Sequence, residues 1–228
     1  MCGRFSIIFS VGFAERFKVT MQDPSPPPRY NVAPSQPVPV IISTPGGGRE
    51  IVEMTWGLLP SWAKDPRSAR RPINARAETL SQRPSFRSPL KHRRCLVPAS
   101  GFFEWKKTNS SRIPYYIHRK DGDHFAFAGL YDIWTAPGSP SQLSFTIVTT
   151  EPNELVSGYH DRMPAILLER NEERWILPGE IPLHSLSEMF TPYPADMLVA
   201  YQVSRAVNNP ENEGKKLIQK QEGLTSIL

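Results

Sequence analysis

The sequence contains few cysteines and lacks both a long apolar run and a hydrophobic N-terminal segment. Its two cysteines, Cys2 and Cys95, are too few for a disulfide framework and do not form a C-x-x-C pair. The five histidines are scattered without metal-ligand spacing, so no metal or other cofactor is expected. No run approaches the roughly 18 apolar residues of a membrane span, and the opening MCGR does not resemble a signal peptide. We therefore expect a soluble, intracellular protein with no membrane partner.

Long helices are also excluded, because proline is unusually abundant. The chain has 24 prolines among 228 residues but only 14 glycines. Proline fixes φ and cannot donate to a strand ladder, so this composition favours many turns and short elements. Hydrophobic residues make up 39% and charged residues 21% of the chain, which is typical of a globular domain. We expect one monomeric domain with a sizeable core.

Positive charge is concentrated in the middle of the chain. Residues 64–120 hold 15 lysines and arginines against three acidic residues, whereas the net charge of the whole chain is only +5. A surface polarised in this way commonly binds a phosphate backbone. A solvated basic face without a ligand is the alternative, and charge alone does not decide between them.

Apolar alternation and turn residues predict many short strands and few short helices. We expect strands at residues 37–43, 50–56, 95–97, 115–118, 125–133, 143–150, 164–168 and 197–204, the first two joined by a hairpin through PGGG. Short helices are expected at residues 10–19, with Ser10 as the cap, near Glu151, and at 171–176. Residues 60–94 are interpreted as irregular, and the polar tail after Asn209 as loosely held. The pattern predicts a single α+β domain with a strongly bent mixed or antiparallel sheet or a barrel-like core.

Cys2 offers unusual chemistry if Met1 is removed. The residue would then carry an α-amine with a pKa near ~7.7–8.0 beside a thiol near ~8.5. The amine can form a Schiff base with an aldehyde, and the thiol can close onto the imine carbon as a five-membered thiazolidine. An internal cysteine lacks this second nucleophile. Taken alone, however, Cys2 can simply be a small residue near the N-terminus.

Seven motifs distributed along the chain resemble, in order, those of the SOS-response-associated peptidase (SRAP) family. They are MCGRF (1–5), RYNVAP (29–34), WGLLPSW (56–62), NARAE (74–78), GFFEW (101–105), HDRMP (160–164) and VSR (203–205). The resemblance predicts an SRAP-like domain at residues 1–220, followed by a C-terminal tail at 221–228.

The resemblance implies a DNA-damage response enzyme without a cofactor. Family members crosslink through Cys2 to abasic sites in single-stranded DNA, after Met1 is lost autocatalytically. The implied partner is single-stranded DNA that contains an abasic site, also at junctions with duplex. AP-lyase activity and, in a bacterium, a cytoplasmic, nucleoid-associated location are further implications.

The family match assigns catalytic roles to Cys2, Asn74, Glu104 and His160. Glu104 lies among aromatic neighbours, where desolvation raises a carboxyl pKa, and it would open the sugar ring and accept a proton. His160 would shuttle protons, and Asn74 would hold the N-terminus by amide hydrogen bonds. The alternatives are a glutamate paired with a nearby cation, a loop histidine bonded to Asp161, and a turn asparagine.

The same match predicts a DNA-binding set. Arginines would contact phosphates, Trp62 would stack on a base, and residues 83–87 would form a wedge between duplex and single strand. Trp62 is followed by Ala63, where a bacterial relative has a second tryptophan. The predicted set is Arg4, Arg76, Arg162, Trp62, Phe86, Arg87, Thr149, Ser204 and Arg205.

Two other functions use part of these features. A thiol peptidase that acts on other proteins would use Cys2 as the nucleophile and His160 as the base. A non-covalent reader of single strands or modified bases would use only the basic surface and the tryptophans. The crosslinking enzyme is favoured because it uses the N-terminal cysteine, the apolar-flanked glutamate and the basic surface together.

Overall fold

The structure, a computed structural model, describes residues 2–21 and 25–221. Its strands are β1 (Phe5–Ile7), β2 (Arg29–Val32), β3 (Pro37–Ser43), β4 (Arg49–Trp56), β5 (Asn74–Arg76), β6 (Arg94–Ala99), β7 (Gly101–Lys107), β8 (Arg112–Arg119), β9 (Phe125–Trp134), β10 (Gln142–Thr150), β11 (Met163–Pro164) and β12 (Leu198–Gln202). The α-helices are α1 (Phe13–Phe17), α2 (Pro84–His92), α3 (Glu154–Ser157), α4 (Glu169–Ile176) and α5 (Leu183–Met189). Short 3₁₀ helices are η1 (Ala77–Thr79), η2 (Ala195–Met197), η3 (Arg205–Asn208) and η4 (Lys215–Ile218).

Five strands close into a small mixed barrel. They pair in the order β10, β4, β3, β6 and β9, and β9 pairs again with β10. The β10–β4 contact is parallel and the others are antiparallel. The core is tightly packed, because a Cβ added at Gly129 would lie 2.6 Å from Cys95 Sγ. The predicted α+β fold with a barrel-like core and short helices is therefore confirmed.

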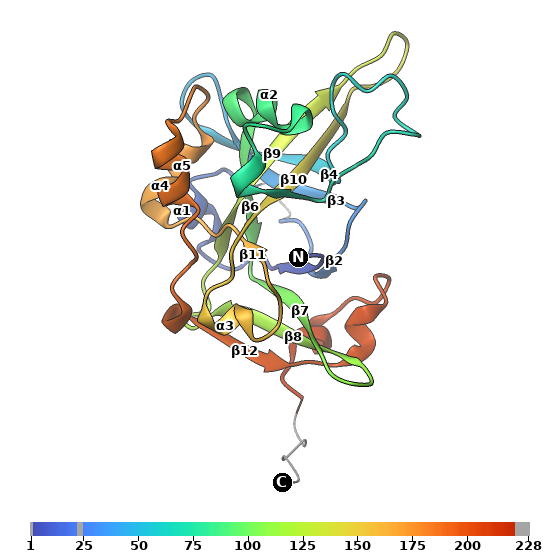
Figure 1. Ribbon diagram of the computed structural model, residues 1–228, viewed down its shortest axis with the longest axis vertical. Coiled ribbons are helices and arrows are strands. Elements are labelled where there is room, and N and C mark those ends of the chain that lie inside the picture. The colour runs from blue at the N-terminus through green and yellow to red at the C-terminus, as the bar shows by residue number, and fades with distance from the viewer. Residues whose placement is uncertain (1, 22–24, 222–228) are drawn as a thin grey trace.

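The second half of β10 extends out of the barrel and organises the neighbouring elements. It pairs with β5 in parallel and with β11 antiparallel. A separate antiparallel sheet, in the order β12-β8-β7-β1-β2, crosses below the barrel in Figure 1. The start of the chain therefore lies between β5 of one sheet and β7 of the other.

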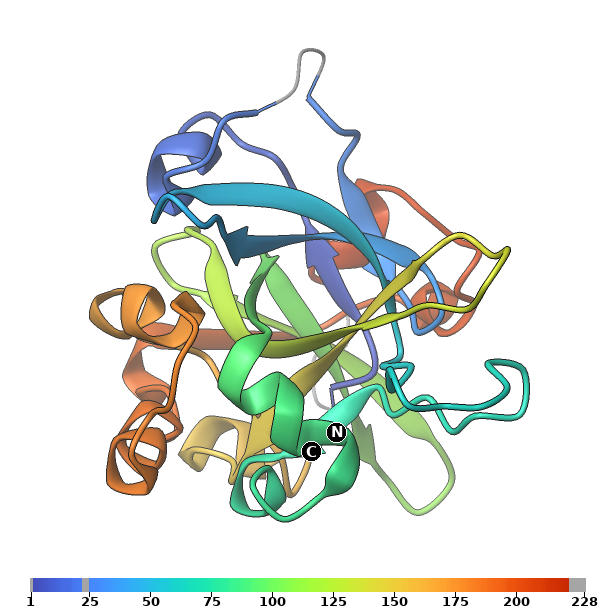
Figure 2. The same ribbon diagram turned by 90° about the horizontal axis from the view of Figure 1, so that it is seen from above.

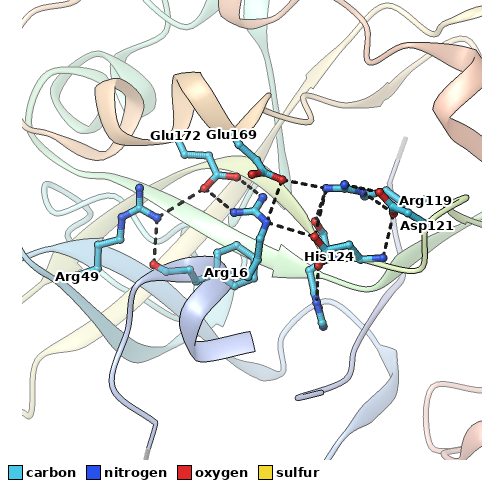
Figure 3. Close-up of polar contacts among 9 residues, drawn as sticks. Arg16, Arg49, Arg119, Asp121, His124, Glu169 and Glu172 are labelled. Carbon is cyan, nitrogen blue, oxygen red and sulfur yellow. Dashed lines mark hydrogen bonds and ion pairs between the residues drawn. The ribbon is translucent and has the colours of Figure 1, made fainter. Parts of the chain in front are cut away.

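The helices lie around the outside of the barrel. Seen from above, α4 and α5 lie together on one side, and η3 and η4 on the opposite side (Figure 2). A network of ion pairs joins α1 to α4 (Figure 3). Buried Glu172 accepts a hydrogen bond from Arg16 at 3.0 Å, and the Arg49 guanidinium lies 3.6 Å away. Within the described residues, no helix is long and apolar enough to span a bilayer.

Several element predictions need correction. Residues 60–94 are not irregular throughout, because they contain β5, η1 and the nine-residue α2, which begins with Pro84. The helix predicted at 10–19 is confined to α1, and Gly12 rather than Ser10 is its N-cap. The helix expected near Glu151 begins at Glu154, and the strand expected at 164–168 shortens to β11.

The tail after Asn209 is also not loosely held over its described part. Leu217 of η4 is buried, and the Tyr201 hydroxyl donates to Ile218 O at 2.8 Å. Near the start of this segment, Asn31 Nδ2 donates to the Asn212 carbonyl at 2.9 Å. The polar composition of this segment led to the wrong prediction, because the segment is held by buried Leu217 and by side-chain hydrogen bonds. Residues 222–228, most of the predicted tail, lie outside the described residues.

Candidate active site and nucleic-acid interface

Cys2 is held where the two sheets meet. It precedes β1, and its carbonyl accepts a hydrogen bond from Asn74 Nδ2 of β5 at 2.9 Å. Its thiol is buried and donates to Arg4 O at 3.9 Å. Burial raises the pKa of the Cys2 thiol far above its usual range, and the nearby Glu104 carboxylate adds to this effect. The thiol is therefore protonated at neutral pH. Met1, which is predicted to be removed, lies outside the described residues.

Glu104 lies on β7, the neighbour of β1, and is almost fully buried. Phe102 and Phe103 before it are completely buried, so the strand fixes its carboxyl group in an apolar setting. Burial raises the pKa of Glu104 to about 7, with a further small contribution from Asp161. A carboxyl group with this pKa can both donate and accept a proton near neutral pH.

His160 approaches the same place from the loop after α3. That helix is capped by Asn153, whose Oδ1 accepts from Val156 N at 2.9 Å. His160 is partly exposed, and its Nδ1 lies 2.6 Å from Asp161 Oδ1 and 3.0 Å from Arg162 N. Burial lowers the pKa of His160, Lys107 acts in the same direction, and Asp161 opposes them.

A cleft of about 840 Å³ joins these groups. Arg76 of β5, Glu104 of β7 and His160 all line it. Asn74 and Cys2 are directly hydrogen-bonded to each other next to Glu104. The structure thus brings the four predicted catalytic residues to one region. No group of three metal-ligating side chains occurs among the described residues.

The predicted phosphate-binding arginines have different surroundings. Arg76 is exposed at the cleft. Arg162 makes a bidentate pair with Glu78, at 2.7 and 3.0 Å, and donates to Thr149 O at 2.6 Å. Arg162 and Thr149 are both buried. Their contacts hold β10 to η1 below the cleft.

Arg4 instead joins the two ends of the chain. Its guanidinium donates to Asn31 Oδ1 at 2.7 Å, to Val207 O at 2.6 Å and to Asn208 O at 3.1 Å. In the same C-terminal region, Ser204 caps η3 by accepting from Ala206 N at 3.2 Å. The Asn31 side chain is completely buried.

Trp62 is presented on a firmly anchored loop. Its side chain is 63% exposed. On one side of it, Ser61 N donates to buried Asp132 Oδ2 at 2.8 Å, and on the other, Trp134 Nε1 donates to Ala63 O at 2.7 Å. An exposed aromatic ring on a fixed backbone is suited to stack on a base.

The predicted wedge divides into two kinds of residue. Phe86 of α2 is buried in the main core, so its ring faces the protein. Arg87 is exposed and donates from Nε to Ser81 O at 3.3 Å. Arg205 is also exposed, and its guanidinium donates to Ser111 Oγ at 3.2 Å.

Comparison with known proteins identifies the family of this chain. A family model described as "SOS response associated peptidase (SRAP)" matches residues 1–210. The chain belongs to the SRAP family. It is 44% identical over 223 residues to the abasic site processing protein YoqW of Bacillus subtilis (strain 168), covering 96% of this chain and 99% of that protein. It is 33% identical to the abasic site processing protein HMCES of Mus musculus, covering 81% of this chain and 63% of that protein.

A solved structure also has this SRAP fold. A protein from Bacteroides thetaiotaomicron superposes with a TM-score of 0.84 at 28% identity, covering 96% of this chain and 100% of that one. A second one, from Bordetella bronchiseptica, has a TM-score of 0.76 at 23% identity, covering 89% of this chain and 100% of that one, and shares the fold.

An aromatic pair that sequence reasoning missed joins two sides of the SRAP cleft. Tyr115 of β8 lies directly opposite Glu104 in the strand register. Its ring packs on that of Tyr159, with centroids 4.6 Å apart, and Tyr159 immediately precedes His160. The pair therefore connects β8, the strand paired with the one that carries the glutamate, to the loop that carries the histidine. Its only sequence signal is the position of Tyr159 beside a motif residue.

Proposed function

We propose that this protein processes abasic sites in DNA by forming a covalent thiazolidine crosslink through Cys2. The names of the curated relatives support the substrate. The observation that carries the chemistry is that Cys2 and Asn74 lie next to Glu104, which lines the cleft and has a pKa of about 7. The three residues come from motifs that are far apart in the sequence, so no single motif accounts for their proximity.

The reaction begins when water hydrolyses the Met1–Cys2 peptide bond and frees the Cys2 α-amine. The amine attacks the aldehyde carbon of the ring-opened abasic sugar, and protonated Glu104 delivers a proton to the departing hydroxyl group. The resulting imine has lost one water. The thiol then adds to the imine carbon, and its proton passes through Glu104 to the nitrogen. The overall product is a thiazolidine with no change in oxidation state.

The environment of each group supports this order of steps. The thiol is kept protonated by burial, so the amine is the better first nucleophile. Asn74 Oδ1 is buried and accepts no hydrogen bond among the described residues, which leaves it able to accept one from the α-amine. His160 would exchange protons with water at the open side of the cleft. β-Elimination by the same groups would give AP-lyase activity.

The basic, aromatic surface supports single-stranded DNA as the substrate. Trp62 would stack on an exposed base, and Arg76, Arg87 and Arg205 would contact phosphates. Arg4 and Arg162 would act mainly by holding the site together, because they already bond to protein acceptors. A junction with duplex would fit the exposed end of α2.

We further propose that the protein is a monomer with one domain at residues 1–220. It would act inside the cell and, in a bacterium, in the cytoplasm on nucleoid DNA.

A peptidase acting on other proteins is less well supported. A cysteine protease needs a thiolate, whereas burial and Glu104 both raise the pKa of the Cys2 thiol. Self-removal of Met1 requires only one turnover in an intramolecular setting. A non-covalent reader of DNA would make no use of the buried Glu104 carboxyl group at the cleft.

Intact mass measurement tests the proposal directly. Protein lacking Met1 should gain the mass of an abasic single-stranded oligonucleotide minus one water, and the adduct should survive denaturation. Cys2→Ala should bind the oligonucleotide without a denaturation-stable adduct. Cys2→Ser is the matched control, because its free amine still forms an imine that borohydride traps but a thiazolidine cannot form. A stable adduct on Cys2→Ala would refute the mechanism.

A further inference from the structure

The β7–β8 hairpin projects from the sheet beside the cleft and carries several positively charged side chains. Lys106 and Lys107 end β7, and Arg112, which begins β8, lies directly opposite Lys107 in the register. All three side chains are exposed, and all three line the same cleft as Glu104 and His160. The hairpin is therefore part of the site's wall as well as a projection from the sheet (Figure 1).

Within the part of the chain that the structure describes, no carboxylate neutralises these three cations. None of them forms an ion pair with a described carboxylate, whereas Arg119 and Arg162, which are buried, both do. Lys107 lies near enough to His160 to help lower the pKa of that imidazole. A group of exposed, unpaired cations at a cleft is an anion-binding arrangement.

The C-terminal segment braces the hairpin. Arg205 donates to Ser111 Oγ in the hairpin turn at 3.2 Å, which adds a fourth cation at its tip. At the base, Trp105 Nε1 donates to Asn208 Oδ1 at 2.8 Å. The turn itself is closed by Thr108 N donating to Ser111 O at 2.9 Å. The cations therefore stand on a supported strand pair.

We propose that this hairpin is a phosphate-binding arm that holds the DNA strand on one side of the abasic nucleotide, through Lys106, Lys107, Arg112 and Arg205. The inference rests on the proposed function for the identity of the strand. Residues 104–107 extend for about 10 Å along β7. This length is enough for the arm to contact more than one phosphate of the strand.

The arm and the tryptophan loop would hold opposite sides of the reacting nucleotide. In Figure 1 the loop of residues 57–73 and the hairpin lie above and below the start of the chain. A strand that reacts at Cys2 can thus continue toward Trp62 in one direction and along the hairpin in the other.

Reversible binding of Cys2→Ala to single-stranded DNA tests the arm without requiring a crosslink. The triple change Lys106→Gln, Lys107→Gln and Arg112→Gln should reduce the slope of log K against log salt by about 2, since each single-strand contact contributes about 0.7. The matched control changes Lys18, Lys120 and Arg170 to glutamine. These exposed cations do not line the cleft, and the net charge falls equally.

Asymmetric oligonucleotides locate the arm. In the protein with Cys2 intact, the triple change should slow crosslinking to an oligonucleotide whose abasic site has nucleotides only on the side that the arm holds. It should not slow crosslinking to an oligonucleotide whose nucleotides lie only on the other side. Equal slopes for the triple variant and its control, or equal slowing with both flanks, would overturn the arm. Failure of the unmodified protein to crosslink would refute the proposed function instead, while the salt slopes would still decide the arm.

Discussion

The buried carboxyl of Glu104 should make folding stability depend on pH in a predictable way. Its pKa is about 7 in the folded protein against an ordinary value of 4.5. Between these values the folded state keeps a proton that the unfolded state has lost, so stability falls as pH rises. At about 1.4 kcal/mol per pKa unit, the full effect is on the order of 3 kcal/mol.

Glu104→Gln removes this titration. The free energy of unfolding of the variant should therefore rise relative to the unsubstituted protein by about 3 kcal/mol from roughly pH 4 to pH 8. Urea unfolding across this range measures the difference, in which other titrating groups cancel. Both proteins should have one defined N-terminus, verified by mass, because the α-amine acts on Glu104. The same substitution at exposed Glu53 is the control. A Glu104→Gln difference that does not vary with pH would refute the reasoning.

Three other substitutions test separate parts of the structure. Trp62→Ala should weaken single-strand binding by about 1–3 kcal/mol in a fluorescence titration, with little effect on unfolding because the ring is largely exposed. Asp132→Ala should lower the unfolding free energy by about 1–3 kcal/mol, since a loop amide and the partly exposed Arg93 lose their acceptor; no measurable loss would contradict the anchor. Gly129→Ala should cost about 1–3 kcal/mol by overpacking against Cys95 Sγ, whereas Gly46→Ala, with open space around its Cβ, should cost much less in the same denaturation assay.

Local patterns predicted most of the longer strands, but β7 was missed because GFFEWKK does not alternate regularly between apolar and polar residues. The alternation of PVPVIIS and the PGGG turn indicated the β3–β4 hairpin, and the apolar run of β9 indicated a barrel strand. The short pieces β1, β2 and β5 were missed because three or four residues carry no clear period. Helix α2 was missed because it contains two prolines besides a polar surface, although Pro84 at its start is favourable there.

The predicted catalytic residues were accessible from the sequence only through the family motifs. Nothing local predicts that Asn74 bonds to the Cys2 carbonyl across 72 positions, or that Arg4 bonds to Val207 across 203. Such contacts depend on how two sheets close against each other. The wedge prediction shows the same limit, since only the fold determines that Phe86 faces the core while Arg87 faces solvent.

The hydrogen bonds of Arg4 also have a consequence for when the region around Cys2 can be completed during synthesis. The carbonyls of Val207 and Asn208 that hold Arg4 are synthesised 203 and 204 residues after it. Until then Arg4 lacks these two acceptors. The contacts that hold Arg4, two residues after Cys2, are therefore completed only after more than two hundred further residues have been made.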